Sequence, residues 1–233
     1  MTDNSHIYSQ IFQHHIKSRS VQKKESYAHH VDMVIAVSGA AGMGKTTFCK
    51  EFLTYLNNNE VSAVHVPLDG FMLDREIRKK KNISGNDPMA SNIPDLIDKM
   101  KSFIHEGREI DLPVYNHMTG KHDEPVRIRP CSVILLDGIM SLHYEIRERF
   151  PNLKIFLFSD DLVIRGFRLK VDMEERGYSV FEALAHSDEE FDAYNRWIYH
   201  QITFADLVIS VGKHRNLSII SKGSYENIPI KRR

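Results

Sequence analysis

The stretch VDMVIAVSGAAGMGKTTF, residues 31–48, decides the fold. It begins with an apolar, β-rich run that has the length and continuity of a buried parallel strand. GAAGMGKT at 39–46 follows at once and matches the pattern G-x-x-x-x-G-K-[ST] in full, and a helical pattern starts directly after it. This order predicts a phosphate-binding loop (P-loop). The alternative, a Gly/Ala-rich turn that binds nothing, is disfavoured because both the spacing and the flanking elements agree.

The residue types in this loop suit nucleotide chemistry. Glycines let backbone amides turn inward around phosphate oxygens, in conformations and at distances that a Cβ would obstruct. Lys45 supplies charge to the β- and γ-phosphates, Thr46 offers a hydroxyl to Mg²⁺, and Thr47 adds a further phosphate contact. The nucleotide-binding set predicted from the loop is Gly39, Ala40, Gly42, Met43, Gly44, Lys45, Thr46 and Thr47.

Strand and helix patterns alternate through the rest of the chain. Helices are predicted near 45–57, 92–106, 141–149, 160–175 and 179–203, and strands at 61–67, 132–137, 153–158 and 205–211. Strands separated by helices imply a mainly parallel sheet that is covered on both faces. The predicted fold is therefore a three-layer α/β fold of the P-loop nucleoside-triphosphate hydrolase type, with a helical lid.

The same patterns divide the chain into three parts. Residues 1–30 form a helical extension, because apolar residues recur at helical spacing over 4–20. Residues 31–215 form the P-loop domain, with irregular insertions at 70–91 and 113–130 and a lid at about 160–178. Residues 216–233 are predicted to be a C-terminal tail.

Composition limits the kind of partner. The 233 residues include 31 basic and 31 acidic side chains, so no overall positive field favours nucleic acid, and a small molecule fits better. Cys49 and Cys131 lack CxxC spacing, which argues against a disulfide framework and a zinc site and favours a reducing cytoplasm. No run approaches the roughly 20 apolar residues that a membrane helix needs, so we expect a soluble, cytoplasmic protein.

Two aspartates follow predicted strands. Asp137 ends the run SVILLD and is the predicted magnesium partner of Thr46; the alternative is a turn residue, because Asp-Gly is a common turn pair. Asp69 closes VSAVHVPLD, at the carboxyl edge of a parallel sheet where ligands bind. A carboxylate there can orient and deprotonate a hydroxyl. Its alternative role is to cap a helix or turn.

Arginines and hydrogen-bonding residues complete the predicted site. Arg165, Arg168 and Arg176 lie on one predicted helix, and guanidinium groups suit the charge on a transferring phosphoryl group; the alternative is a solvated charged helix. An acceptor pocket would use directional hydrogen bonds. The candidate acceptor-binding residues are Asp69, Arg75, Asp87, Tyr115, Asn116, His117 and Asp172. Arg75, Arg78 and the lysines at 79–81 could bind a substrate phosphate, or could form a solvated loop.

Five segments identify a family. The chain has no NKxD guanine-reading motif and no LSGGQ transporter signature, which disfavours GTPases and transport ATPases. The chain resembles the phosphoribulokinase/uridine kinase family, from about Val31 to Val211. The segments that carry the resemblance are LDGFMLDR (68–75), NDPMAS (86–91), PVYNHMTGKHDEP (113–125), ILLDG (134–138) and RLKVDMEERGYS (168–179).

The resemblance implies an enzyme that uses Mg·ATP to phosphorylate a hydroxyl of a small pentose-containing metabolite, as phosphoribulokinase does. It implies Lys45, Asp69, Arg168 and Arg176 as catalytic residues, with Asp69 as the base, and it also suggests a homo-oligomer. A uridine or cytidine kinase is the alternative. Met72 stands where the family commonly has His or Tyr, and Val171 stands where Arg is usual. These departures leave open a nucleotide-sensing regulatory module; a motor-type ATPase is a third option.

Overall fold

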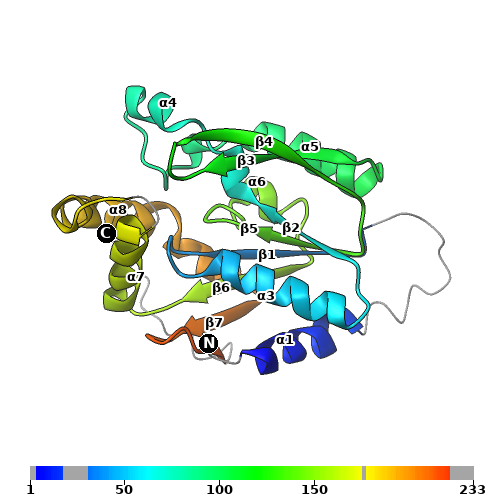
Figure 1. Cartoon of the computed structure of the whole chain (residues 1–233). Helices are drawn as coiled ribbons and strands as arrows, with labels where there is room; N and C mark the ends of the chain where they lie inside the picture. The colour runs from blue at the N-terminus through cyan, green and yellow to red at the C-terminus, as the bar shows by residue number, and fades with distance from the viewer. Residues whose placement is uncertain (1–3, 18–30, 175–176, 221–233) are drawn as a thin grey trace.

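The structure is a computed structural model that describes residues 4–17, 31–174 and 177–220. Its main sheet has the strand order β2-β5-β1-β6-β7-β8 (Figure 1). Neighbouring strands are parallel except β7 and β8, which run antiparallel. The strands are β1 (Met33–Gly39), β2 (Ala63–Pro67), β5 (Val133–Asp137), β6 (Leu153–Phe158), β7 (Leu207–Val211) and β8 (Leu217–Ile220). The predicted α/β fold is confirmed.

Buried side chains on both faces of the sheet explain why its central strands read as continuous apolar runs. Every residue of β1 and β5 is buried, and successive side chains point to opposite faces. Ile35 and Leu135 join the cluster under α3 (Lys45–Asn58), whereas Val34 and Ile134 join the cluster under α5 (Ile93–His105) and α6 (Tyr144–Arg147). The sheet therefore lies between two helical layers.

The N-terminal helix is part of the core. Helix α1 (Ser5–Ile11) continues into a short π-helical turn, η1 (Phe12–Ile16). The Tyr8 ring stacks on Phe52 of α3 at 5.5 Å between centroids, and its hydroxyl donates a hydrogen bond to Glu51 at 2.6 Å. Burial and the Glu51 carboxylate raise the pKa of Tyr8. The predicted extension thus packs against the helix that follows the P-loop.

An Ile11→Ala variant tests whether α1 stabilises the domain. Ile11 is 1% exposed in the main core cluster, so its truncation should lower the free energy of unfolding by about 2–5 kcal/mol. Urea denaturation followed by circular dichroism measures this. Gln13→Ala, on the exposed side of η1, is the control and should change stability by less than about 0.5 kcal/mol. Equal effects of the two changes would contradict the packing described here.

The segment predicted to be an irregular insertion at 113–130 contains an antiparallel hairpin instead. Its strands are β3 (Ile110–Asn116) and β4 (Lys121–Ile128), with a register shift between Leu112 and Val114. Pro113 and Pro125 hide the pattern, and seven consecutive residues of β4 are exposed, so no apolar alternation marks it as a strand. The hairpin lies above the sheet, next to α5 (Figure 1).

The segment predicted as a lid, at about 160–178, corresponds to the first of two helices beside the P-loop end of β1 (Figure 1). Helix α7 (Asp161–Glu174) is followed by α8 (Val180–Trp197), which begins with a capping box between Ser179 and Glu182. The predicted helix 179–203 in fact divides into α8 and a 3₁₀ segment, η5 (Tyr199–Phe204). Three short elements precede α5, namely η3 (Leu68–Phe71), α4 (Arg75–Lys80) and η4 (Pro88–Ala90).

The expectation that a tail begins at residue 216 is wrong, because Leu217–Ile220 form β8 and pair with β7. Within the ranges that the structure describes, no helix combines the length and the apolar character needed to cross a bilayer.

Candidate active site

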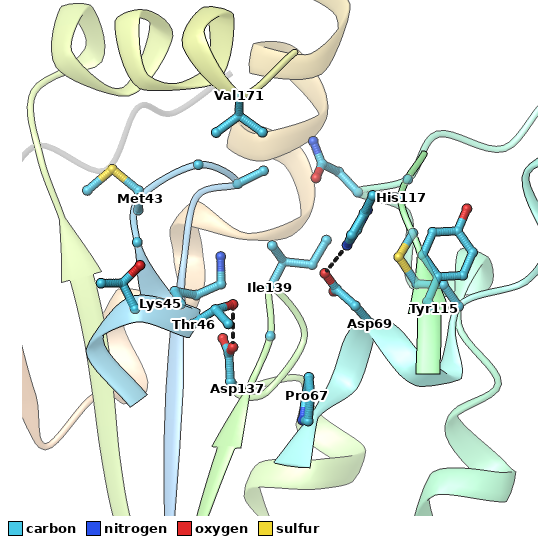
Figure 2. A pocket seen from close by; sticks show the side chains of 18 of the residues that line it. Met43, Lys45, Thr46, Pro67, Asp69, Tyr115, His117, Asp137, Ile139 and Val171 are labelled. Atoms are coloured by element: carbon cyan, nitrogen blue, oxygen red, sulfur yellow. Dashed lines mark hydrogen bonds and ion pairs between the residues drawn. The ribbon is translucent and has the colours of Figure 1, made fainter. Parts of the chain in front are cut away.

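A cavity of about 1670 Å³ lies at the carboxyl ends of β1, β2 and β5. The P-loop and α7 line one part of it, and η3, β3 and α4 line another. Lys45, Asp137, Asp69 and His117, which come from four separate segments, all lie around it (Figure 2). Ligands of open parallel sheets bind at this edge.

The P-loop is held in the conformation that its glycines permit. Gly39, Gly42 and Gly44 have φ values of 143°, 78° and 86°. A Cβ on Gly39 would lie 2.5 Å from the carbonyl oxygen of Leu157, so the neighbouring strand β6 also requires glycine there. The loop leads directly into α3, whose N-terminal amides and dipole favour an anion.

Lys45 is buried at the start of α3 and donates a hydrogen bond from Nζ to the carbonyl oxygen of Ala40 at 2.9 Å. Burial lowers the pKa of Lys45, whereas the negative charges of Asp137 and Asp69 act in the opposite direction. A phosphate in the cavity would add further negative charge and favour the ammonium form. Among the other predicted nucleotide residues, Gly42, Met43, Gly44, Thr46 and Thr47 line the cavity, and Gly39 and Ala40 do not.

Asp137 is a buried carboxylate directly below the P-loop (Figure 2). Its Oδ2 accepts a hydrogen bond from the Thr46 hydroxyl at 2.7 Å and lies 3.1 Å from Nε2 of His65. Its Oδ1 is buried, and no hydrogen-bond partner for it occurs in the described part of the chain. A hydroxyl and a carboxylate with an unsatisfied oxygen match the oxygen ligands that Mg²⁺ prefers.

Asp69 faces the hairpin. It lies in η3, just after β2, and its Oδ2 is 3.1 Å from Nε2 of His117, which follows β3 (Figure 2). Both side chains are partly exposed to the cavity, at 42% and 39%. Arg75 donates a hydrogen bond to the carbonyl oxygen of His117 and thereby ties α4 to this end of the hairpin. The imidazole therefore orients a carboxylate that an incoming ligand can still reach.

Helix α7 contributes one buried arginine to the cavity. Arg168 is 9% exposed, and its guanidinium bonds Asp172 at 2.9 Å and Glu190 at 3.2 Å. Arg165 is turned to α8, where it pairs with Asp188 at 2.6 Å, and it does not line this cavity, so its nucleotide contact stays a prediction. Arg176 lies outside the described residues.

The candidate acceptor residues divide into two groups. Arg75, Tyr115, His117 and Asp172 line the cavity, whereas Asn116 and Asp87 do not. The Asn116 side chain bonds Asp123 and accepts from two backbone amides of the hairpin turn. Asp87 caps η4 by accepting from the Met89 amide. In this structure both side chains serve local turn and cap structure, as Asn and Asp often do, and their acceptor role stays a prediction.

Sequence reasoning missed two residues that contact the site. His65 reaches Asp137 from the middle of β2. Arg215 donates a hydrogen bond to the carbonyl oxygen of Gly42 at 2.8 Å, and its guanidinium lies 3.6 Å from the Phe167 ring centroid. Asn4 of the N-terminal segment in turn donates to the carbonyl oxygen of Arg215. No local pattern indicates either contact, because both join segments far apart in the chain.

The fold and the site define a P-loop protein of the class that handles nucleotide phosphates. The family model of the phosphoribulokinase/uridine kinase family matches residues 34–218, and the chain belongs to this family. The resemblance stated from five segments is thus confirmed.

Individual relatives agree with this assignment. A phosphoribulokinase of Synechocystis sp. is 31% identical over 179 residues, which cover 77% of this chain and 53% of that protein. A uridine kinase of Lactobacillus helveticus is 25% identical over 192 residues, which cover 80% of this chain and 90% of that protein. The crystal structure of a phosphoribulokinase from Rhodobacter spheroides superposes with a TM-score of 0.59 at 18% identity, covering 78% of this chain and 70% of that one. The chain spans about half the length of the phosphoribulokinases of Synechocystis sp. and Triticum aestivum.

Proposed function

We propose that this protein is an ATP-dependent kinase that transfers the γ-phosphoryl group to a hydroxyl of a small, pentose-containing metabolite. The observation that carries the proposal is the placement of the Asp69–His117 pair in the same cavity as Lys45 and the P-loop. A nucleotide-binding loop alone would serve many reactions, but a second, partly exposed carboxylate and imidazole across the cavity supply a means of activating an acceptor.

The P-loop side binds the nucleotide. Backbone amides of residues 39–47 surround the phosphates, and Lys45 neutralises the charge of the β- and γ-phosphates. Thr46 and Asp137 would hold Mg²⁺, which would offset the negative charge that develops during transfer. Arg168, held by Asp172 and Glu190, adds a guanidinium to the lid side of the cavity.

Asp69 serves as the base. Its carboxylate accepts the proton of the acceptor hydroxyl while the new P–O bond forms and the bond between the γ-phosphorus and the departing ADP oxygen breaks. The His117 imidazole, 3.1 Å away, fixes the orientation of that carboxylate. Positioning of the hydroxyl and of the phosphates in one cavity supplies much of the rate enhancement expected for such an enzyme.

The acceptor side is cationic, which favours a phosphorylated acceptor over a neutral nucleoside. Arg75, Arg78 and Lys79 line the cavity near Tyr115. Arg78 donates a hydrogen bond to the Tyr115 hydroxyl at 2.8 Å, and both its Nε and Nη2 atoms are held by protein oxygens. A guanidinium held in one orientation in this way suits recognition of a phosphate group. Met72 and Val171 also line the cavity, so the two departures from the family pattern fall at the site and bear on acceptor choice.

An Arg78→Gln variant tests the phosphate-binding role. If Arg78 contacts a phosphate on the acceptor, the change should raise KM for that acceptor by about tenfold, the effect of losing one charged hydrogen bond, and leave KM for ATP unchanged. Steady-state kinetics with each substrate varied in turn measures this. Lys80→Gln, on the same helix but outside the cavity, is the control. A rise in KM for ATP alone would contradict the assignment.

Purified protein with Mg·ATP and a panel of pentose phosphates, uridine, cytidine and pantothenate tests the function as a whole. ADP release that depends on one acceptor supports a kinase and identifies the substrate class. Turnover of uridine or cytidine instead of a sugar phosphate would replace the phosphoribulokinase-like assignment with the nucleoside kinase alternative. ATP binding without turnover of any acceptor would favour a regulatory module.

We further propose that the protein works in the cytoplasm as a homo-oligomer. The equal numbers of acidic and basic residues, the absence of a candidate membrane helix among the described residues, and two unbridged cysteines support the first part. The family resemblance supports the second. Sedimentation of the purified protein tests the oligomeric state.

A further inference from the structure

Three side chains with metal-ligating atoms meet beneath the P-loop. Cys49 comes from the second turn of α3, His65 from β2 and Asp137 from the end of β5. One ligand atom of each lies within 4.8 Å of the corresponding atoms of the other two. Cys49 and Asp137 are 0% and 3% exposed, whereas His65 and Asp137 also line the nucleotide cavity, which gives an ion a route to the cluster.

The spacing of these atoms is close to that of a tetrahedral site. Bonds of about 2.3 Å to sulfur and about 2.0–2.1 Å to nitrogen or oxygen place ligand atoms about 3.6 Å apart. His65 Nε2 and Asp137 Oδ2 are already 3.1 Å apart. Because all three ligand atoms lie within 4.8 Å of one another, movements of about 1 Å would bring them to the spacing of a tetrahedral site. Small side-chain rotations supply movements of this size.

The donor set selects a particular class of cation. A thiolate, an imidazole and a carboxylate suit Zn²⁺ and its spectroscopic substitute Co²⁺, whereas Mg²⁺ prefers oxygen ligands. The buried Asp137 Oδ1 lacks a hydrogen-bond partner in the described part of the chain. The cluster therefore has a further oxygen atom that could coordinate a cation. The spacing of cysteines in the sequence argued against a zinc site, but it could not show that one cysteine lies beside His65 and Asp137.

We propose that Cys49, His65 and Asp137 form a binding site for a thiophilic divalent cation such as Zn²⁺, and that its occupation inhibits the protein. Binding would release the thiol proton of Cys49 to solvent as the metal–sulfur bond forms. It would also take Asp137 Oδ2 away from the Thr46 hydroxyl and place a second positive charge beside the proposed Mg²⁺ site, which would weaken Mg²⁺ binding. The inhibitory consequence rests on the proposed kinase function; the binding itself does not.

A Co²⁺ titration of the metal-free protein tests binding without any assay of activity. A thiolate ligand gives an intense sulfur-to-cobalt absorption in the near ultraviolet, so the wild type should develop this band at one equivalent, and Zn²⁺ should displace it. Cys49→Ala should abolish the band. His65→Gln, which keeps a hydrogen-bond donor near Asp137, should weaken binding by at least the roughly 10- to 100-fold that loss of an outer-shell partner costs.

The other cysteine provides the matched control. Cys131 lies outside both the cluster and the cavity, so Cys131→Ser should bind Co²⁺ like the wild type. Melting temperatures in excess chelator establish that each variant is folded. No sulfur-to-cobalt band in the folded wild type, or loss of the band in Cys131→Ser but not in Cys49→Ala, would overturn the proposed site.

Inhibition is measured separately, with an acceptor that is turned over. Zn²⁺ should inhibit the wild type, incubation with Mg·ATP beforehand should slow the inhibition, and Cys49→Ala should resist it. Equal inhibition of the wild type and Cys49→Ala would show that Zn²⁺ acts elsewhere. If no acceptor is turned over, the kinase proposal fails, and the Co²⁺ titration still decides whether the site exists.

Discussion

A Lys45→Met variant is expected to lose about 100- to 1000-fold in kcat/KM, the cost of removing one group that stabilises transition-state charge. Lys45 is buried where the P-loop meets α3, and methionine keeps most of its volume while removing its charge. The variant should therefore fold but bind and use the nucleotide phosphates poorly. Steady-state kinetics and the affinity for a fluorescent ATP analogue measure the two effects.

Lys99→Met is the control for the Lys45 change. Lys99 lies on α5, outside the cavity, and forms an ordinary i,i+4 ion pair with Asp95. The Lys99→Met change should leave both kcat/KM and the affinity for the ATP analogue unchanged. Wild-type turnover by a folded Lys45→Met protein would show that the P-loop lysine does not act on the transferred group.

Asp69→Asn is expected to lower kcat by about 10²- to 10⁴-fold, the range for loss of a general base, with little change in ATP affinity. Asparagine keeps the shape of aspartate and a hydrogen bond to His117, but it cannot accept the proton of the acceptor hydroxyl. Steady-state kinetics give kcat, and titration with the ATP analogue gives the affinity.

The contact between the start of α4 and the hairpin offers a closely matched control. Asp74 and His122 form a second pair, also at 3.1 Å, with exposures of 37% and 35%, but neither residue lines the cavity. Asp74→Asn should therefore retain wild-type kcat. If the two substitutions reduced kcat equally, the effect would come from disturbed hairpin structure and not from loss of a base.

Much of this arrangement follows from local sequence. The P-loop could be predicted because its glycines, its lysine and its flanking elements are contiguous. Asp69 and Asp137 could be placed at one edge because parallel strands bring their carboxyl ends together. Helix α7 could be predicted from its pattern, but the pattern could not show that Arg168 lines the cavity whereas Arg165 pairs with Asp188 outside it.

The parts of the fold and the site that could not be predicted depend on contacts between segments that are far apart in the chain. The β3–β4 hairpin has a largely exposed second strand and two prolines. No alternation of apolar and polar residues therefore indicates that the two strands pair. His65 and Arg215 reach the site only through the packing of β2 and of the β7–β8 turn. Asn116 and Asp87 carry side chains of the kind that could bind an acceptor. These side chains instead accept hydrogen bonds from neighbouring backbone amides.

The most direct test of phosphoryl transfer from ATP to an acceptor is to measure both products of one reaction. Wild-type protein, Lys45→Met and Asp69→Asn are incubated with Mg·ATP and the acceptor identified by the panel, and ADP and phosphorylated acceptor are quantified by mass spectrometry. We expect equal amounts of both products from the wild type and a large loss of both from each variant. ADP without phosphorylated acceptor, or undiminished product from folded Asp69→Asn, would contradict this expectation.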